Sequence, residues 1–345
     1  MDKLGDSMDY KSSGVDVAAG EQAVRNIKSM VSKTYNQNVL SDLGSFGGLY
    51  RLDLSKWQHP VLVSSTDGVG TKLRVAIMAE RYNTVGQCLV NHCVNDILVQ
   101  GAHPQFFLDY IGLASMNTQM VEEIIKGMVQ ACEENSCALI GGEMAEMPGI
   151  YQAGDFDLAG TIVGLVEEDQ VLPRNLSAGD LVMAFPSTGL HTNGYSLARR
   201  IVFDHLKLST HSYVPELGAS LMDLLLAVHR SYYKDLLPHL CDPGLHGLAH
   251  ITGGGIRGNL KRVIPEGLSA EISFMKIRIL PVFAWLAKVG GLDMDASFEA
   301  FNLGVGMIAI VNEELAAKLE ASTDAYRIGK LISRSDESEP VQMVL

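Results

Sequence analysis

An apolar run that stops at an aspartate and two glycines constrains the fold more than any other feature of the sequence. Residues 60–66 (PVLVSST) have the composition of a buried strand, and residues 67–72 (DGVGTK) follow without a spacer. The glycines permit positive φ angles and carry no side chains, so a phosphate could approach the backbone N–H groups. Asp67 could hold Mg²⁺, and Lys72 could neutralise a phosphate. A plain strand–turn–helix capped by Thr71 is the alternative.

Segments typical of strands and of helices alternate along the chain, so we expect an α/β or α+β fold. A helix is also expected directly after the glycine turn. The other expected helices are residues 20–32, 85–100, 121–132, 195–205, 220–237 and 313–321, and the other expected strands are residues 106–108, 138–140, 158–166, 181–185 and 304–311. Residues 167–179 combine an acidic run with Pro173, which is typical of a linker. We therefore expect two domains, residues 1–170 and 171–345.

The charge balance limits the kinds of partner. A net charge of −13 over 345 residues argues against nucleic acid and anionic membranes, so a phosphate must be held locally. The five cysteines have no C-x-x-C spacing, and we expect reduced thiols in a cytoplasmic protein. Residues 1–6 lack the pattern of a secretory signal, and charges interrupt the apolar runs too often for a membrane span.

Two further groups of polar residues stand in apolar or glycine-rich surroundings. Asn95 and Asp96 belong to a helix that is apolar on most sides, where a carboxylate is costly unless it is paired or binds metal. Glu143 and Glu146 lie between glycines on an expected loop directly after a strand, which suits metal binding. A solvent-facing helix stripe and a solvated acidic loop are the alternatives.

Two glycine-bordered loops could contact an anion. His191 and Asn193 lie in residues 187–195, at the expected start of a helix, where anions are attracted. Residues 253–258 match G-x-G-x-x-G, but Pro265 ends the following helix early and no acid follows at the distance that a dinucleotide fold requires. Phosphate contact or a tight turn is therefore favoured for this second loop, and a plain surface loop is the alternative for the first.

Several other catalytic patterns are missing from the sequence. No G-x-x-x-x-G-K-[ST] string and no protein-kinase signature occurs, so any use of ATP involves an uncommon nucleotide fold. His246 and His250 are four residues apart and could share a helix face, but no glutamate lies between them, which argues against a zinc hydrolase. No cysteine has the setting of a nucleophilic thiol.

Taken together, these motifs resemble the aminoimidazole ribonucleotide synthetases, also called the phosphoribosylformylglycinamidine cyclo-ligase family. The resemblance covers nearly the whole chain, whereas any one motif would identify only the wider superfamily of ATP-dependent synthetases and kinases. The matching segments are residues 10–11 (YK), 14–16 (GVD), 67–72, 94–96 (VND), 141–149, 191–197, 250–255 and 301–307.

The resemblance implies a two-domain α/β synthetase fold and a homodimer in which the N-terminal domains build a shared β-barrel. It implies ATP and Mg²⁺ as cofactors and formylglycinamidine ribonucleotide as the substrate, in de novo purine biosynthesis. ATP would phosphorylate the formyl oxygen to give an iminophosphate. The amidine nitrogen would then attack the same carbon, and the imidazole ring would close as phosphate leaves. Catalysis would come mainly from positioning and charge neutralisation.

The resemblance also implies roles for individual residues. The expected catalytic residues are Asp67, Lys72 and His191, and the expected metal ligands are Asp67, Asp96 and Glu143. The residues expected to contact the nucleotide are Lys28, Gly44, Phe46, Gly47, Gly68, Gly70, Thr71 and Asn95. Those expected to contact the ribonucleotide are His191, Asn193, Thr252, Gly253, Gly254 and Gly255.

The chain departs from the family pattern at Met144, Leu190, Leu303 and residues 256–258, which affects loop shape more than chemistry. Selenophosphate synthetase is disfavoured because the first cysteine, Cys88, lies well past the N-terminal glycine-rich loop. Thiamine phosphate kinase would not be expected to share residues 191–197 or 301–307, and a glutamine-using relative would need a longer chain. A protein that binds ATP without turnover is the alternative from another class.

Overall fold

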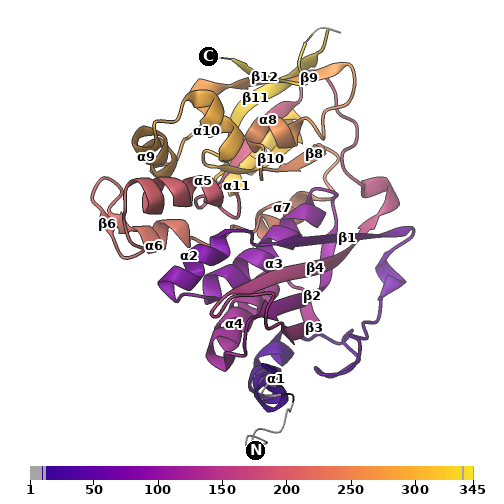
Figure 1. Cartoon of the computed structure of the whole chain (residues 1–345). Helices are drawn as coiled ribbons and strands as arrows, with labels where there is room; N and C mark the ends of the chain where they lie inside the picture. Colours follow the sequence, from indigo (N-terminus) through magenta and orange to yellow (C-terminus); the bar gives the residue numbers. More distant parts are fainter. Residues whose placement is uncertain (1–9, 11–12, 336–337, 345) are drawn as a thin grey trace, which may run out of the picture.

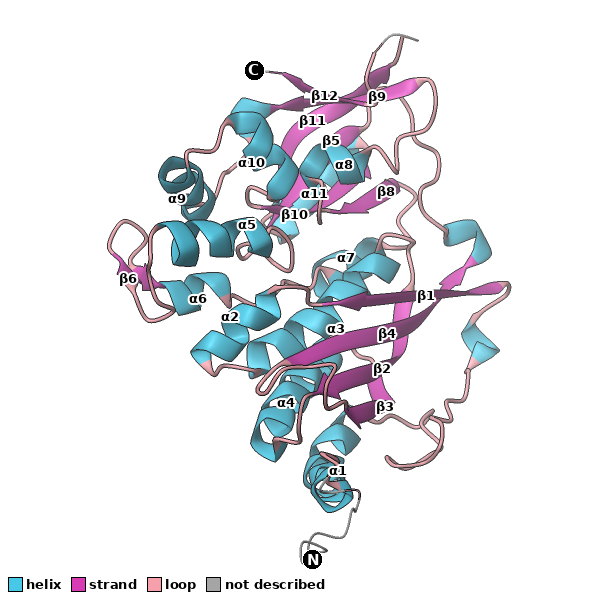
Figure 2. Cartoon of the chain, in the orientation of Figure 1, coloured by secondary structure: helices cyan, strands magenta, loops and turns pink. Residues whose placement is uncertain are grey.

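The chain folds around two separate β-sheets, one in each half of the sequence (Figure 1). A computed structural model describes residues 10, 13–335 and 338–344, so residues 1–6 and Lys11, which entered the sequence argument, lie outside the described residues. Helices and strands are mixed through both halves (Figure 2), which confirms the expected α/β class. Within these ranges, no helix is both long and apolar enough to cross a membrane.

The N-terminal sheet has four strands in the order β1-β4-β2-β3. The bounds are Pro60–Gly68 for β1, His103–Leu113 for β2, Ala138–Glu146 for β3 and Phe156–Glu167 for β4. β4 is antiparallel to both of its neighbours, whereas β2 and β3 are parallel. The sheet therefore ends in β1 on one side and in β3 on the other.

Helices cover one face of this sheet, as Figure 2 shows. α3 (Asn83–Leu98) and α4 (Thr118–Glu134) pack on the sheet, α1 (Val17–Val31) packs against α4 and β3, and α2 (Lys72–Ala79) contacts α3. α4 is amphipathic and begins at Asn117, whose side chain accepts a hydrogen bond from Met120 N–H. α3 differs, because every residue from Thr84 to Leu98 except Asp96 is buried. It packs between the sheet, α4 and the C-terminal half.

Two glycines allow α3 and α4 to approach closely. A Cβ atom on Gly86 would lie 2.1 Å from the Ile124 carbonyl oxygen, and one on Gly127 would lie 1.9 Å from the Asn83 carbonyl oxygen. Real Cβ atoms cannot occupy such positions, so both helices depend on glycine at this crossing.

The C-terminal sheet has six strands in the order β12-β9-β11-β5-β10-β8. Its strands are β5 (Leu181–Pro186), β8 (Leu245–His250), β9 (Leu268–Ser273), β10 (Val305–Val311), β11 (Tyr326–Ser333) and β12 (Val341–Val344), and a separate hairpin pairs β6 (Tyr213–Val214) with β7 (Ala219–Ser220). The helices are α5 (Tyr195–Arg199), α6 (Leu221–Leu225), α7 (Tyr233–Leu236), α8 (Gly255–Leu260), α9 (Pro281–Gly290), α10 (Met294–Ala300) and α11 (Glu313–Ser322). All seven residues of β10 are buried, as befits a strand with neighbours on both sides.

Short helical turns complete the chain. Three-residue 3₁₀ turns cover Ser32–Thr34, Leu54–Lys56, Glu168–Gln170, Leu237–His239 and Phe274–Lys276, and a π-helical turn, Arg200–His205, continues α5. The two sheets are joined by the segment between β4 and β5, and no strand pairing links them in the described part of the chain. The domain boundary after residue 170 stays a prediction.

Three local expectations were wrong. The acidic segment that holds Glu143 is not a loop, because β3 continues through Glu146 in parallel pairing with β2. His246 and His250 lie on strand β8 rather than on a helix. The helix expected over residues 220–237 is broken between α6 and α7, where the His229 N–H group donates to Cys88 Sγ and the Tyr232 N–H group donates to Asn95 Oδ1. These hydrogen bonds to α3 replace the bonds of a continuous helix.

The second face of the N-terminal sheet has no helical cover in Figure 1. Leu62 on β1 is 59% exposed there, and the paired residues Val163 on β4 and Phe106 on β2, farther along the same face, are partly exposed. The sheet of one chain is open rather than closed into a barrel. The expected barrel requires two chains and stays a prediction.

Replacing Gly127 with alanine tests the helix crossing. We expect the Gly127→Ala variant to lose about 2–3 kcal/mol of unfolding free energy, because the new methyl group must push α3 and α4 apart. Urea unfolding measures this change. Gly20→Ala in α1 is the matched control, since a Cβ atom there would meet only Met116 Cε, at 3.9 Å. Equal urea midpoints for the two variants would contradict the close contact between α3 and α4.

Candidate functional site

Histidines and aspartates from both halves meet where α3 packs against the C-terminal sheet. Asp67 lies near the end of β1, His92 and Asp96 lie one turn apart on α3, and His250 ends β8. Asp67 Oδ2 lies 2.8 Å from His92 Nε2, and Asp96 Oδ2 lies 3.7 Å from the same nitrogen. Asp96 Oδ1 lies 2.8 Å from His250 Nδ1. Two carboxylates that are far apart in sequence therefore approach one imidazole ring.

A network of rings and hydroxyls extends from this acid pair into the C-terminal half. His92 Nδ1 lies 2.6 Å from Thr192 Oγ1, which lies 3.3 Å from His229 Nδ1. His229 Nε2 lies 3.0 Å from His250 Nε2. The His191 ring stacks on His229 with a centroid separation of 4.0 Å. The site thus exists only when the two halves are docked.

The surroundings shift the protonation equilibria of these groups. Burial alone would raise the pKa of Asp67, but the hydrogen bond and charge of His92 outweigh it and lower the pKa. Burial lowers the pKa of His250 despite the adjacent Asp96, and it places the pKa values of His191 and His229 well below that of a free imidazole. The site therefore combines an ionised carboxylate with neutral imidazoles at neutral pH.

Lys72 occupies a position that differs from the expected one. Its side chain is fully buried, and its ammonium group donates to the carbonyl oxygens of His191 (2.9 Å) and Ala227 (2.6 Å) in the C-terminal half. It also approaches Cys88 Sγ, at 3.2 Å. Burial lowers the pKa of Lys72. In this structure the Lys72 ammonium group therefore links the two halves of the chain.

Asn95 is likewise enclosed. Its Oδ1 accepts from Tyr232 N–H (3.1 Å), and its Nδ2 donates to the Arg230 carbonyl oxygen (2.9 Å). The side chain is fully buried, so it connects α3 to the C-terminal half and is not open to a nucleotide.

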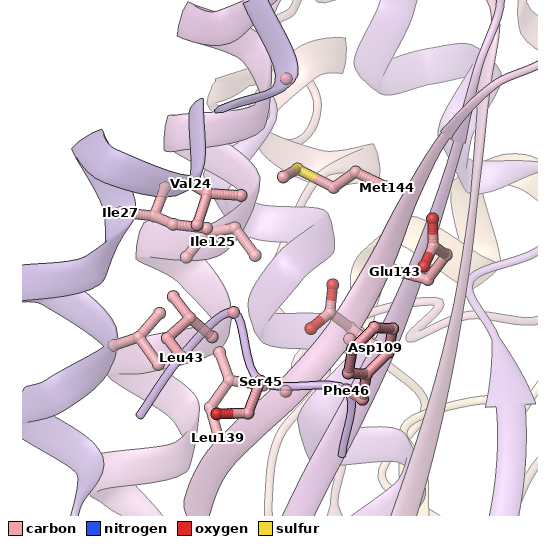
Figure 3. Close-up of a pocket in the computed structure, with 15 residues that line it drawn as sticks. Val24, Ile27, Leu43, Ser45, Phe46, Asp109, Ile125, Leu139, Glu143 and Met144 are labelled. Atoms are coloured by element: carbon pink, nitrogen blue, oxygen red, sulfur yellow. The ribbon is translucent and has the colours of Figure 1, made fainter. Parts of the chain in front are cut away.

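A cavity of about 400 Å³ lies apart from the histidines, beside α1 and α4. Figure 3 shows Val24, Ile27 and Ile125 on one wall and the carboxylates of Asp109 and Glu143 near the ring of Phe46. The loop over residues 43–46 closes one side, and Phe46 is fully exposed on it. Apolar walls with a few polar groups are typical of a small-molecule site.

The predicted metal ligands do not all come together. Glu143 pairs with Tyr110, Tyr110 with Ala159, and Ala159 with Gly68 beside Asp67. Three strand spacings of ~4.8 Å put the Cα atom of Glu143 roughly 14 Å from that of Gly68, the neighbour of Asp67. Glu143 lines the cavity instead, so the expected cluster of three acids is not formed within one chain.

The other predicted residues fall into two groups. Gly44, Phe46 and Glu143 line the cavity, and Lys28, on α1, pairs with Asp42 of the same glycine-rich segment, at 3.4 Å. Gly68, Gly70 and Thr71 form the exit of β1 and the start of α2, and Gly47 is exposed.

The predicted substrate residues gather beside the histidine network. A Cβ atom on Gly253 would lie 3.2 Å from Asn193 Oδ1, so these two loops are adjacent. Thr252 bonds to Asn259 (Oγ1–Oδ1, 3.1 Å), while Gly254 and Gly255 have positive φ at the start of α8. His191 accepts from Thr188 N–H through Nε2, and its Nδ1 has no hydrogen-bond partner among the described residues.

Sequence reasoning missed two histidines of this site. His92 was not singled out within its apolar helix, although a polar ring among buried residues was a usable signal. His229 was assigned to a continuous helix, and no local pattern indicated that the chain turns there.

Comparison with known proteins identifies the family. Residues 50–166 match the family described as AIR synthase related protein, N-terminal domain, and residues 177–341 match the corresponding C-terminal domain. A phosphoribosylformylglycinamidine cyclo-ligase of Geobacter sulfurreducens is 44% identical over 97% of this chain and 98% of its own. One of Geobacillus thermodenitrificans is 44% identical over 94% and 95%. The chain belongs to the phosphoribosylformylglycinamidine cyclo-ligase family. This membership confirms the resemblance inferred from the motifs.

Solved structures show that the fold of the cyclo-ligase family is shared more widely. Thiamine-monophosphate kinase from Stenotrophomonas maltophilia superposes with a TM-score of 0.68, over 96% of this chain and 97% of its own, at 16% identity. Hydrogenase maturation protein HypE in complex with ATP gives 0.63 over 92% and 90%, at 19% identity. These identities establish a common fold alone.

Replacing Lys72 with methionine separates its two roles in this member of the cyclo-ligase family. We expect the Lys72→Met variant to lose roughly 2–4 kcal/mol of unfolding free energy, because the buried carbonyls of His191 and Ala227 lose their donor. Thermal unfolding measures the loss, with Lys126→Met, an exposed lysine, as the control. Full stability combined with lost ADP formation would instead favour the phosphate role.

Asp109 should make stability depend on pH. Burial raises the pKa of Asp109 to about 7, so the folded protein holds a proton that the unfolded chain releases near pH 4. Wild-type stability contributed by this proton is present at low pH and is lost as pH rises from about 4 to 7.

The Asp109→Asn variant removes this ionisation. We expect its free energy of unfolding to exceed that of the wild type by roughly 2 kcal/mol at pH 8 and to differ little at pH 4. The value at pH 8 is discounted for the partial exposure of the side chain. Urea unfolding at both pH values provides the test. Asp53→Asn, where hydrogen bonds from Ser55 lower the carboxyl pKa, should show no such gain. An equal difference in unfolding free energy at both pH values would contradict the raised pKa of Asp109.

Proposed function

We propose that the chain catalyses the ATP-dependent ring closure of formylglycinamidine ribonucleotide to aminoimidazole ribonucleotide, with release of ADP and phosphate. The main support is the 44% sequence identity to two bacterial cyclo-ligases over almost the whole chain. The paired carboxylates at the docking surface and the apolar cavity support it, because a reaction between a nucleotide and a ribonucleotide needs room for two ligands.

The chemistry proceeds in two displacements. The formyl oxygen attacks the γ-phosphorus, ADP leaves, and an iminophosphate forms. The neighbouring amidine nitrogen then attacks the same carbon, the C–O bond to phosphate breaks, and the nitrogen loses a proton. Phosphate is a good leaving group where an amide oxygen is not, so the protein has to supply alignment and charge neutralisation.

Asp67 and Asp96 are the residues that would hold Mg²⁺. Their carboxylates approach the same His92 nitrogen, Asp67 is 44% exposed, and carboxylate oxygens are the donors that Mg²⁺ prefers. Bound there, Mg²⁺ would neutralise the triphosphate. Glu143 does not fit the same ion, because it lies roughly three strand spacings away.

We propose that the nucleotide base enters the cavity beside α1. Val24, Ile27 and Leu139 offer apolar walls, and the exposed Phe46 stands on a loop that could cover a bound base. Lys28 lies on the same helix near this loop and would approach the phosphates. HypE, a protein of the same fold, has been solved with ATP.

The ribonucleotide is proposed to lie against the loops that hold Asn193 and Gly253. The backbone N–H group of Gly254 would donate to its phosphate, since glycines admit close approach. His191 is buried below these loops. It would therefore act through its stacking contact with the His229 ring.

We also propose a homodimer and a cytoplasmic location. The uncovered face of the N-terminal sheet presents Leu62, Phe106 and Val163, and a second copy would bury them in a shared barrel. The five cysteines are free thiols, which suits a reducing compartment.

The decisive experiment supplies formylglycinamidine ribonucleotide and Mg²⁺-ATP to the full chain. Formation of the imidazole, ADP and phosphate in equal amounts is the expected result. ADP formation that does not depend on the ribonucleotide would reject the proposal. ATP binding with neither ADP nor imidazole formed would reject it too and would favour a protein that binds nucleotide without turnover.

The Asp67→Asn variant tests the proposed metal ligand. We expect kcat to fall by roughly 100-fold or more, because the γ-phosphate loses the charge neutralisation of a correctly held ion. ADP release measured with ribonucleotide present is the readout, and Asp169→Asn, on an exposed turn, is the matched control. Wild-type turnover in Asp67→Asn would remove Asp67 from the mechanism.

The Leu62→Arg variant tests the dimer. An arginine on the uncovered face would have to be buried in the barrel without a partner, so we expect a monomer in light scattering where the wild type is a dimer. Leu237→Arg, an exposed leucine in the C-terminal half, should leave the mass unchanged. A monomeric wild type would contradict the proposal.

A further inference from the structure

One acidic side chain of the cavity beside α1 has no partner elsewhere in the described part of the chain. Of the described residues that line this cavity, Ser45, Asp109 and Glu143 have polar side chains, and the others are apolar or glycine. The Asp109 carboxyl group accepts a hydrogen bond from its own backbone N–H group and from no other described residue. Figure 3 shows this carboxyl group near the ring of Phe46. Asp109 therefore has hydrogen-bonding capacity to offer to a ligand.

A glycine on the neighbouring strand opens this carboxyl group to the cavity. Asp109 lies on β2 and pairs with Gly142 of the edge strand β3. A Cβ atom on Gly142 would lie 2.4 Å from Asp109 Oδ1, so the carboxyl group occupies space that a side chain on β3 would fill. The carboxyl group thus leans over the edge strand toward the cavity that both residues line.

Burial keeps a proton on Asp109 near neutral pH. It raises the pKa of the carboxyl group to about 7, against the hydrogen bond from the residue's own N–H group, which favours the ionised form. The ionisable groups nearby are the Cys132 thiol on α4, whose pKa burial also raises, and Glu143 on β3. α1 contributes apolar residues to the cavity wall, and its exposed Lys28 pairs with Asp42.

The proposed Mg²⁺ ligands lie apart from this carboxyl group. Gly160 on β4 pairs with Asp67 on one side and with Asp109 on the other. Two strand spacings of ~4.8 Å therefore put the Cα atoms of Asp67 and Asp109 roughly 10 Å apart. A role for Asp109 toward a ligand in the cavity leaves the metal ligands unchanged.

A neutral carboxyl group presents one donor and one acceptor side by side, because its O–H group donates and its carbonyl oxygen accepts. Adenine carries the matching pair: its 6-amino group donates and the adjacent ring nitrogen accepts, and an asparagine side chain reads these two groups together. An ionised carboxylate has acceptors alone and would place a negative oxygen against the ring nitrogen. Enzymes keep carboxylic acids neutral in apolar sites when the acid has to donate a hydrogen bond.

We propose that Asp109 is a specificity-determining residue whose neutral carboxyl group pairs with the 6-amino group and the adjacent ring nitrogen of adenine. This inference rests on the proposed function, in which the base of ATP enters this cavity. A buried hydrogen-bonding group discriminates strongly between ligands, since a base that lacks the amino group leaves the carbonyl oxygen of Asp109 unpaired.

The first test follows the affinity for Mg²⁺-ATP between pH 6 and pH 9, in the full chain and its Asp109→Asn variant. The amide keeps a donor and an acceptor at every pH, and both proteins meet the same ionisation of the triphosphate. With a pKa of about 7, the ionised fraction of Asp109 rises from roughly a tenth to nearly all of it over this range. The Kd of the wild type, divided by that of Asp109→Asn, should therefore rise at least about 10-fold.

Asp53→Asn is the matched control for this titration, because hydrogen bonds from Ser55 lower the pKa of that exposed carboxyl group. Its affinity for Mg²⁺-ATP should follow that of the wild type at each pH. The same pH dependence in the wild type and in Asp109→Asn would overturn the inference.

The second test removes the amino group from the ligand. Purine ribonucleoside triphosphate lacks the 6-amino group and keeps the rest of ATP. At pH 6 the wild type should bind it about 10-fold more weakly than ATP, whereas Asp109→Leu, which has no hydrogen-bonding group to lose, should bind the two nucleotides with similar affinity. Calorimetry gives the four Kd values. An equal cost of removing the amino group in both proteins would overturn the pairing.

The outcomes separate this inference from the proposed reaction. Imidazole formation together with nucleotide affinities that ignore Asp109 would overturn the inference alone. ATP binding with the expected dependence on pH and on the amino group, but without imidazole formation, would reject the reaction and support the recognition of adenine by Asp109. A chain that binds no ATP would overturn both.

Discussion

The structure depends on a helix that is buried on nearly all sides and yet carries hydrogen-bonding side chains. On α3, Asn91 donates to the His229 carbonyl oxygen, His92 contacts Thr192, and Asn95 bonds to Arg230 and Tyr232. Each partner comes from the C-terminal half. A buried polar group without a partner costs roughly 1–3 kcal/mol, so separating the halves would be costly at several points at once. The polar residues of α3 and the docking of the two halves therefore depend on each other.

The same constraint produces the candidate site. Asp96 is the residue of α3 that remains partly accessible at the docking surface, 25% exposed, and His250 reaches it from the last position of β8. Lys72 strengthens the arrangement, since its buried ammonium group binds carbonyls on two C-terminal segments. The acid pair consequently has a fixed geometry before any ligand binds, which favours precise alignment of a phosphate or an ion.

Sequence reasoning succeeded where a residue conflicts with its immediate surroundings. Asp67 after an apolar strand and Asp96 in an apolar helix were both recognisable, and the structure brings them to the same ring. Glu143 looked equivalent, but strand order separates it from them. Strand order depends on pairing between distant segments, and no local pattern encodes it. His229 was missed for a related reason, since its backbone turns to satisfy partners on α3.

The sequence by itself determined the class of fold, most of the helices and strands, the glycine-bordered loops and the family. These properties follow from residue periodicity, backbone freedom at glycine and the order of motifs along the chain. Only the tertiary structure decided three further points. The buried Lys72 links the two halves, Glu143 lines a separate cavity, and Asp96 contacts His250 from the C-terminal half. The physical reason is that contacts between distant segments depend on how two apolar cores pack. A change of one strand position in a sheet displaces a residue by about 5 Å, which is enough to remove it from a site.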